Sequence, residues 1–151
     1  MGRGTARTIR RALAGAGALT LLTGAPAGAA AGPTVQVAPD RGLVDGQQVT
    51  VTGTGLEDIC IRGQGCSPVG ILECDRDAPL TIENWDQHCV FLGNAQQTAD
   101  GYRAEVRVHT TFTPRRPGSR GVNCGANGCD VVAGGVANGF TFVSTPISFS
   151  K

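Results

Sequence analysis

The chain has 151 residues, of which 23 are Gly and 6 are Cys, while 17% are charged and 5% aromatic. Low charge with many β-branched residues excludes a disordered chain, the lack of a three-residue Gly period excludes collagen, and the scarcity of Glu, Lys and Leu excludes a coiled coil. The length suits one domain, and the abundance of Cys, Gly, Val and Thr predicts a small β domain held together by disulfides.

Residues 1–31 read as an export signal. The apolar run 12–22 is too short to span a bilayer as a helix, and A-x-A triplets follow it. A basic segment precedes the run, made of Arg3, Arg7, Arg10 and Arg11. An amphipathic N-terminal helix or a membrane anchor is the alternative, and the Arg10-Arg11 pair leaves twin-arginine export open beside general secretion. We expect a cleaved signal peptide, residues 1–31, and a secreted domain, residues 32–151, that is not bound to a membrane.

Removing the signal reverses the sign of the net charge. Residues 1–31 carry four of the 13 basic and none of the 12 acidic residues, so the remaining chain has 9 basic and 12 acidic residues and a formal charge of −3. A net-acidic domain is poorly suited to phosphate backbones, so we expect no direct nucleic-acid binding. The local basic segment of Arg115, Arg116 and Arg120 is more typical of a solvated loop than of a phosphate site.

The first half of the domain alternates short strands with turns. Apolar residues at every second position predict strands at 35–37 and 49–51, and the apolar run 69–74 is typical of a central strand buried on both sides. Two segments without a strand pattern interrupt this series, namely 56–67, which is irregular, and 75–87, which is polar and turn-like.

The second half contains the clearest strand, residues 102–109, in which apolar and charged residues alternate strictly. A loop rich in Arg, Pro and Gly follows at 113–121, and shorter strands are expected at 131–132, 140–142 and 147–149. No segment beyond the signal carries a sustained helical stripe. Short strands spaced by about ten residues predict an all-β sandwich or barrel, with no second domain.

The six cysteines of an exported chain indicate disulfides rather than a metal site. Six cysteines allow 15 connectivities, of which short spacing favours Cys60–Cys66, Cys74–Cys89 and Cys124–Cys129. A metal site is disfavoured because the chain has no C-x-x-C motif and because His88 and His109 are typical of surface residues. We therefore expect no bound metal.

Catalytic signatures are weak, and we expect the protein not to be an enzyme. The chain has no G-x-S-x-G motif. Asp75 with Asp77, or Glu83 with Asp86, could form an acid–base pair. Each pair, however, lies in a polar loop, where contact with solvent gives carboxyl groups no special acid–base reactivity.

Several segments, in their order and spacing, resemble the neocarzinostatin family of secreted actinobacterial apoproteins. They are 33–35 (PTV), 39–46 (PDRGLVDG), 53–56 (GTGL), 98–101 (TADG), 122–131 (VNCGANGCDV) and 147–150 (ISFS), with Phe112 closing the long strand. The resemblance covers nearly all of residues 33–150. It implies an immunoglobulin-like sandwich of seven antiparallel strands beside a small two-stranded lobe. It also implies secretion, with association with the cell envelope as a variant, and a monomer.

In this family a cleft between sandwich and lobe holds an unstable enediyne chromophore non-covalently, and the released chromophore cleaves DNA. The resemblance implies no other cofactor. It places Cys74–Cys89 at the floor of the cleft and equates Cys124–Cys129 with the family's second disulfide, whereas Cys60–Cys66 is additional. The candidate cleft residues are Cys74, Cys89, Trp85, Phe91, Phe112, Val132 and Gly134.

The cleft also departs from the family pattern. Residues 75–77, where the family has an aromatic ring, are Asp-Arg-Asp. An apolar polycyclic guest needs apolar or aromatic walls, so we expect fewer rings and more charge. Trp85 could fold back as a substitute, although a loop anchor is the plainer interpretation. The two candidate functions are binding and protection of a small apolar molecule, with any antibacterial action due to the guest, and a secreted structural or interaction module that uses loops 75–88 and 113–121.

Overall fold

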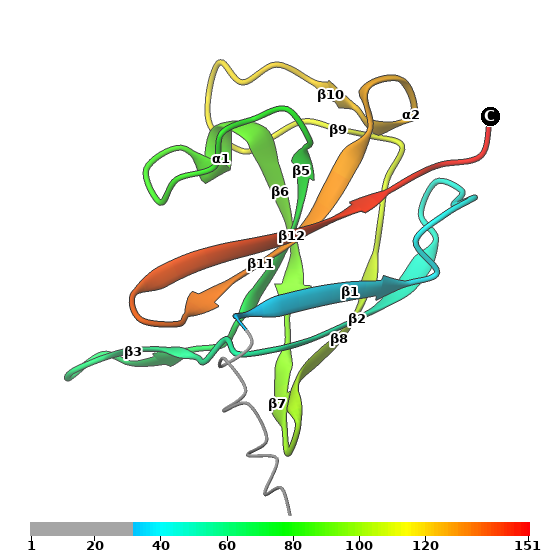
Figure 1. The fold of residues 1–151 in the computed structure, drawn as a ribbon. Helices are drawn as coiled ribbons and strands as arrows, with labels where there is room; N and C mark the ends of the chain where they lie inside the picture. The colour runs from blue at the N-terminus through cyan, green and yellow to red at the C-terminus, as the bar shows by residue number, and fades with distance from the viewer. Residues whose placement is uncertain (1–31) are drawn as a thin grey trace, which may run out of the picture.

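The computed structural model describes residues 32–151, which form two four-stranded sheets and two two-stranded ribbons (Figure 1). The expected signal peptide, residues 1–31, lies outside the described residues. The first sheet has the order β1 (Thr34–Ala38), β2 (Gln48–Thr54), β8 (Gly101–Arg107) and β7 (Gln96–Thr98). The second has the order β12 (Phe140–Ile147), β11 (Cys129–Val136), β5 (Gly70–Asp75) and β6 (Cys89–Asn94).

The smaller elements are two ribbons and two single-turn helices. They are β3 (Ile59–Ile61) with β4 (Gly65–Ser67), β9 (Thr111–Phe112) with β10 (Val122–Asn123), α1 (Trp85–His88) and α2 (Cys124–Asn127). Sequence patterns did not predict the helices because four residues are too few to show a helical period. Within residues 32–151 no helix is long and apolar enough to span a membrane.

The expected all-β antiparallel sandwich is confirmed, and every pairing between named strands is antiparallel. The two large sheets contain eight strands rather than the seven expected. The difference arises at Ala95, where one run of chain leaves β6 in the second sheet and continues as β7 in the first. The β3–β4 ribbon supplies a two-stranded lobe, and the β9–β10 ribbon is a second one that the sequence patterns did not reveal.

The core lies between the two sheets and follows the predicted patterns. In β8 the side chains of Tyr102, Ala104 and Val106 are buried and those between them are exposed, as the alternation predicted. The strand ends at Arg107, two residues early, because the backbone N–H of Val108 bonds to Gln47 and that of His109 to a side chain of β5. As predicted, β5 is a central strand that is buried on both sides.

All three predicted disulfides are present. Their pairs are Cys60–Cys66, Cys74–Cys89 and Cys124–Cys129. The first joins directly opposed residues of the exposed β3–β4 ribbon, and the second joins opposed residues of β5 and β6. The third closes α2 against the start of β11, where both sulfur-bearing residues are buried.

Tyr102 ties the first two strands of the chain to β8. Its ring is buried and its hydroxyl donates a 2.6 Å hydrogen bond to the carbonyl of Thr34. Burial raises the pKa of Tyr102 to about 12, so the hydroxyl keeps its proton in neutral solution. Gly53 lies directly opposite Tyr102, and a Cβ there would collide with the tyrosine ring and with the Thr34 carbonyl.

We expect Gly53→Ala to lower the free energy of unfolding by about 1–3 kcal/mol, because the added methyl forces Tyr102 out of its position. Urea denaturation monitored by circular dichroism checks the value. Gly121→Ala is the matched control, since a Cβ there meets nothing closer than 3.9 Å. The control should be neutral or slightly stabilising, as expected when a glycine is replaced without strain. Equal effects at the two positions would contradict the packing argument.

Candidate functional site

The outer face of the second sheet carries an apolar cluster that is separate from the sandwich core. Its buried members, called the floor here, are Leu72, Cys74, Cys89 and Val132. The strand registers explain the grouping, because opposed residues share a face and Leu72 pairs with Val132 while Cys74 pairs with Cys89. The two halves of a disulfide thus form part of an apolar surface that faces away from the core.

Aromatic rings extend the floor on both sides. Phe142 packs against it, and the ring is accommodated by Gly134 on the facing strand, where a Cβ would lie 3.0 Å from the ring. Phe140 meets Phe142 edge to face, with ring centroids 4.9 Å apart. Phe91 pairs with Leu72 across β5 and β6. With Trp85, which also packs on the floor, the face carries more rings than the departures from the family pattern led us to expect.

The face is hollowed by a cavity of about 240 Å³ with an apolar base and a charged rim. Its lining consists of Cys74, Asp75, Arg76, Ala78, Leu80, Asp130, Val132, Phe142 and Ser144. Charged residues at 75–77 were expected from the sequence. In the structure Asp130 lies at the same rim. The composition suits a small apolar molecule with a polar edge, because apolar walls bury the body of a ligand and a few polar groups orient it.

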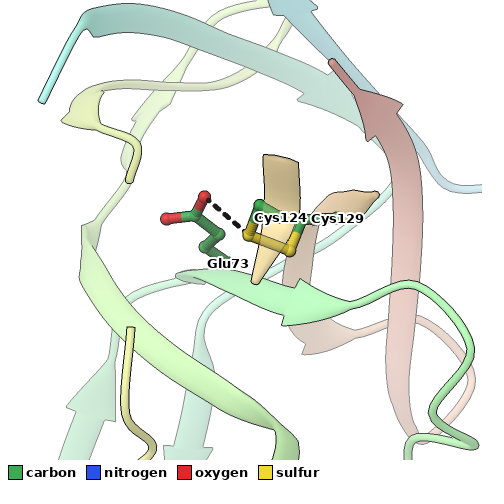
Figure 2. Close-up of side chains that lie close together, drawn as sticks. All are labelled: Glu73, Cys124 and Cys129. Atoms are coloured by element: carbon green, nitrogen blue, oxygen red, sulfur yellow. Dashed lines mark hydrogen bonds between the residues drawn. A yellow bond between two sulfur atoms is a disulfide. The ribbon is translucent and has the colours of Figure 1, made fainter. Parts of the chain in front are cut away.

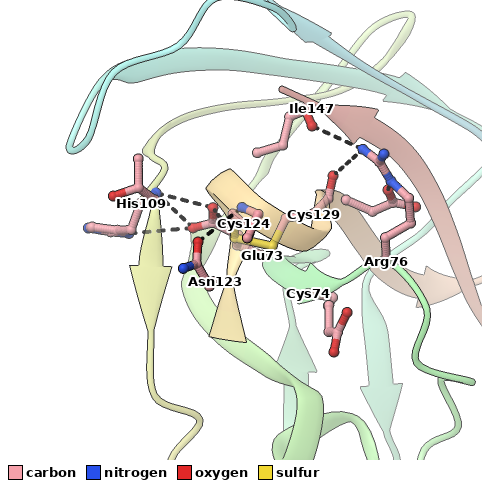
Figure 3. The surroundings of a disulfide bond; sticks show 12 residues. Glu73, Cys74, Arg76, His109, Asn123, Cys124, Cys129 and Ile147 are labelled. Carbon is pink, nitrogen blue, oxygen red and sulfur yellow. Dashed lines mark hydrogen bonds and ion pairs between the residues drawn. A yellow bond between two sulfur atoms is a disulfide. The ribbon is translucent and has the colours of Figure 1, made fainter. Parts of the chain in front are cut away.

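Arg76 fixes the rim by joining the ends of three strands (Figure 3). Its Nε donates to Asp130 Oδ1 at 2.9 Å, and its Nη2 donates to the carbonyls of Cys129 and Ile147 at 2.9 and 3.0 Å. The protein therefore accepts three hydrogen bonds from the guanidinium, and these bonds join the three strand ends at the rim.

Most of the predicted cleft residues lie on this one face. Cys74, Cys89, Trp85 and Val132 belong to the floor cluster or pack on it, and the registers place Phe91 and Gly134 beside them. Phe112 does not join them, because it pairs with Val122 in the β9–β10 ribbon and packs against the sandwich core.

Sequence reasoning missed three contributors to the face, namely Leu72, Leu80 and Phe142. The two-residue spacing of Phe140 and Phe142 predicted that they share a face. Which face they share depends on pairing between β11 and β12, which no local pattern specifies.

On the opposite side of β5, Glu73 is a fully buried carboxylate that the sequence patterns did not single out (Figure 2). The backbone N–H of His109 donates to its two oxygens at 3.1 and 3.0 Å, and His109 Nδ1 lies 3.4 Å from Oε2. His109 is therefore bonded to the interior rather than being a plain surface residue, although its side chain is 41% exposed.

Burial raises the pKa of Glu73 to about 8, more than the His109 N–H lowers it, and the charge of Asp45 raises it further. Cys124 Sγ lies 3.6 Å from Glu73 Oε1. Since a disulfide sulfur carries no proton, only a protonated Glu73 can donate the hydrogen bond drawn in Figure 2. Glu73 and the two sulfurs lie within 4.8 Å of one another, but sulfurs bonded to each other are not thiolate ligands, so the group is not a metal site.

Comparisons with known proteins place the chain in a family. The model of the neocarzinostatin family matches residues 35–149. Among solved structures, macromomycin is 24% identical with a TM-score of 0.47, over 78% of this chain and 98% of that one. Apokedarcidin is 22% identical with a TM-score of 0.43, over 79% of this chain and 99% of that one. No curated protein matches the chain. Because the family match extends over most of its length, the chain belongs to the neocarzinostatin family.

Proposed function

We propose that the protein binds and protects a small apolar molecule on the outer face of its second sheet. The observation that carries this proposal is the hollow of about 240 Å³, whose apolar base is formed by Cys74, Val132 and Phe142. Family membership suggests an enediyne-type chromophore as the guest, and any DNA damage or antibacterial action would then belong to the guest. Phe91 and Gly134 complete the proposed site, whereas the position of Phe112 favours a role in the core.

The protein acts as a carrier rather than an enzyme, it holds no metal, and its acidic domain makes no direct contact with nucleic acid. Three disulfides are consistent with secretion. We propose that residues 32–151 are the secreted domain, that it is a monomer, and that residues 1–31 are removed on export.

Titration with N-phenylnaphthylamine, a neutral dye that fluoresces in apolar surroundings, tests the site. We expect saturable binding that Phe142→Ala weakens by roughly two- to tenfold, because a lost aromatic contact is worth about 0.5–1.5 kcal/mol. Val44→Ala is the control, since Val44 is 58% exposed and is not part of the floor. Circular dichroism verifies that the variants are folded. Equal affinity for Phe142→Ala and wild type would reject the site.

One observation favours the alternative of a secreted interaction module. The β3–β4 ribbon projects from the sandwich (Figure 1), its two cysteines are exposed, and Ile61 is 53% exposed. A ribbon closed by a disulfide presents such a side chain at low entropic cost to a partner. This alternative predicts that the protein binds no apolar molecule. It also predicts that the protein binds a partner protein and that the Ile61→Ser substitution abolishes this binding.

A further inference from the structure

We propose that residues 77–88 form a tethered lid that occupies part of the binding site, and that Trp85 competes with the guest for the floor. This inference rests on the proposed function. Trp85 thereby limits both the affinity for the guest and the size of the guest. A wall residue has the opposite effect, because it contacts the guest and strengthens binding.

Two side chains of this segment cover part of the floor. Trp85 and Leu80 are both partly buried, and both pack on the cluster of Leu72, Cys74, Cys89 and Val132. Leu80 also lines the remaining hollow. The free volume of about 240 Å³ is smaller than the roughly 300–1,000 Å³ typical of ligand pockets. The indole and the leucine side chain therefore take up apolar surface that a larger guest would need.

The second observation is that the segment is fixed at its two ends and ordered within itself. Arg76 is held by Asp130 and by two backbone carbonyls, and Cys89 by its disulfide. Between them, Thr81 N–H donates to Asn84 Oδ1 at 2.7 Å, and Asn84 Nδ2 donates to the Pro79 carbonyl at 2.8 Å. A segment with fixed ends and internal bonds can swing as a unit without unfolding the sheet beneath it.

Besides these apolar contacts, polar contacts with Arg116 hold the segment in place. Arg116, from the loop at 113–121, donates through Nη1 to the carbonyl of Glu83 at 3.2 Å and pairs with Asp86 at 3.4 Å. The backbone N–H of Arg116 also donates to the carbonyl of Asp86 at 3.3 Å. Both charged side chains are partly exposed, so water can replace these bonds at modest cost. Arg116 therefore acts as a latch rather than as a permanent clamp.

The fraction of protein with an open lid sets the apparent affinity for the guest. When the binding-competent state is only partly populated, the apparent dissociation constant is the intrinsic constant divided by that fraction. Removing the competing indole, or releasing the latch, raises the fraction of open protein. Both changes should tighten binding, whereas loss of a wall residue would weaken it.

The test measures N-phenylnaphthylamine affinity for the wild type and three variants. We expect Trp85→Ala to bind about tenfold more tightly and Arg116→Ala about threefold more tightly, while Ile82→Ala, on the same segment but 55% exposed, is unchanged. Arg116→Ala leaves the floor intact, so it tests the lid even if Trp85→Ala unfolds. In the wild type, a bound dye should displace the indole of Trp85 and expose its N–H to solvent. A soluble gadolinium chelate should then relax the NMR signal of this N–H faster than it does without the dye. Trp85 is the only tryptophan, so this signal is unique.

The outcomes separate the two proposals. Failure of the wild type and of both open variants to bind the dye would reject the binding function itself. Wild-type binding with weaker or unchanged affinity in Trp85→Ala and Arg116→Ala would reject the lid alone. An indole signal that is equally or better protected when the dye is bound would also overturn it.

Discussion

As the pH rises from about 4.5 to about 8, the domain is expected to lose about 4–5 kcal/mol of its free energy of unfolding through Glu73 alone. The pKa of this carboxyl is raised from 4.5 in its ordinary state to about 8 in the fold, chiefly because it is buried. Each pKa unit corresponds to about 1.4 kcal/mol. In this range the unfolded chain has released the proton while the folded protein still holds it. Stability therefore falls with rising pH and levels off above about 8.

Two other carboxyl groups, Asp45 and Glu105, have lowered pKa values. Thr110 donates through its backbone N–H and its hydroxyl to Asp45 and lowers the pKa of that carboxyl, so Asp45 stays ionised throughout. Its stabilising effect is lost only in more acidic solution, as the pH falls through its lowered pKa. Hydrogen bonds from Thr50 and Arg103 lower the pKa of Glu105, which also titrates on the acidic side.

Urea denaturation at a series of pH values, on the wild type and Glu73→Gln, measures the effect. Glutamine keeps an oxygen to accept the His109 N–H but has no proton to release, so the decline should vanish in the variant. Glu105→Gln is the matched control, because this exposed glutamate lies outside the core and the variant should retain the wild-type decline. A decline of the same size in Glu73→Gln would show that another group causes it.

Removal of the floor disulfide is expected to have the second largest effect. Cys74→Ala with Cys89→Ala should lower the free energy of unfolding by about 3 kcal/mol, since a bond across 15 residues restricts the unfolded chain by that amount in the loop-entropy model. The same variant should bind N-phenylnaphthylamine more weakly, because the buried sulfurs form part of the floor.

The comparison variant is Cys60→Ala with Cys66→Ala. This bond lies in an exposed ribbon that packs little against the sandwich, so its loss should loosen the ribbon and change global unfolding by less than about 1 kcal/mol. Differential scanning calorimetry on both double variants gives the result. A loss for the ribbon pair as large as that for the floor pair would mean that the ribbon folds as part of the sandwich.

Features that depend on neighbours in the chain could be predicted from the sequence. The alternation at 102–109 indicated which side chains of β8 face the core, because successive side chains of a strand point to opposite faces. The disulfides joined cysteines separated by 5 to 15 residues, where short spacing is informative. The motifs shared with the neocarzinostatin family then indicated the arrangement of the sheets.

The composition of the site could not be predicted in this way, because it depends on which strands pair and in what register. Phe142 lies over the floor because it opposes Gly134, and Trp85 reaches it because a loop folds back over the sheet. Glu73 is the one charged residue in the apolar run 69–74, and the packing of β5 beneath His109 buries it and raises its pKa. The sequence by itself determined the strands β1, β2, β5, β8, β11 and β12, the disulfides and the family, but not the strands β3, β4, β6, β7, β9 and β10. Only the tertiary structure decided which side chains meet, because those contacts join residues far apart along the chain.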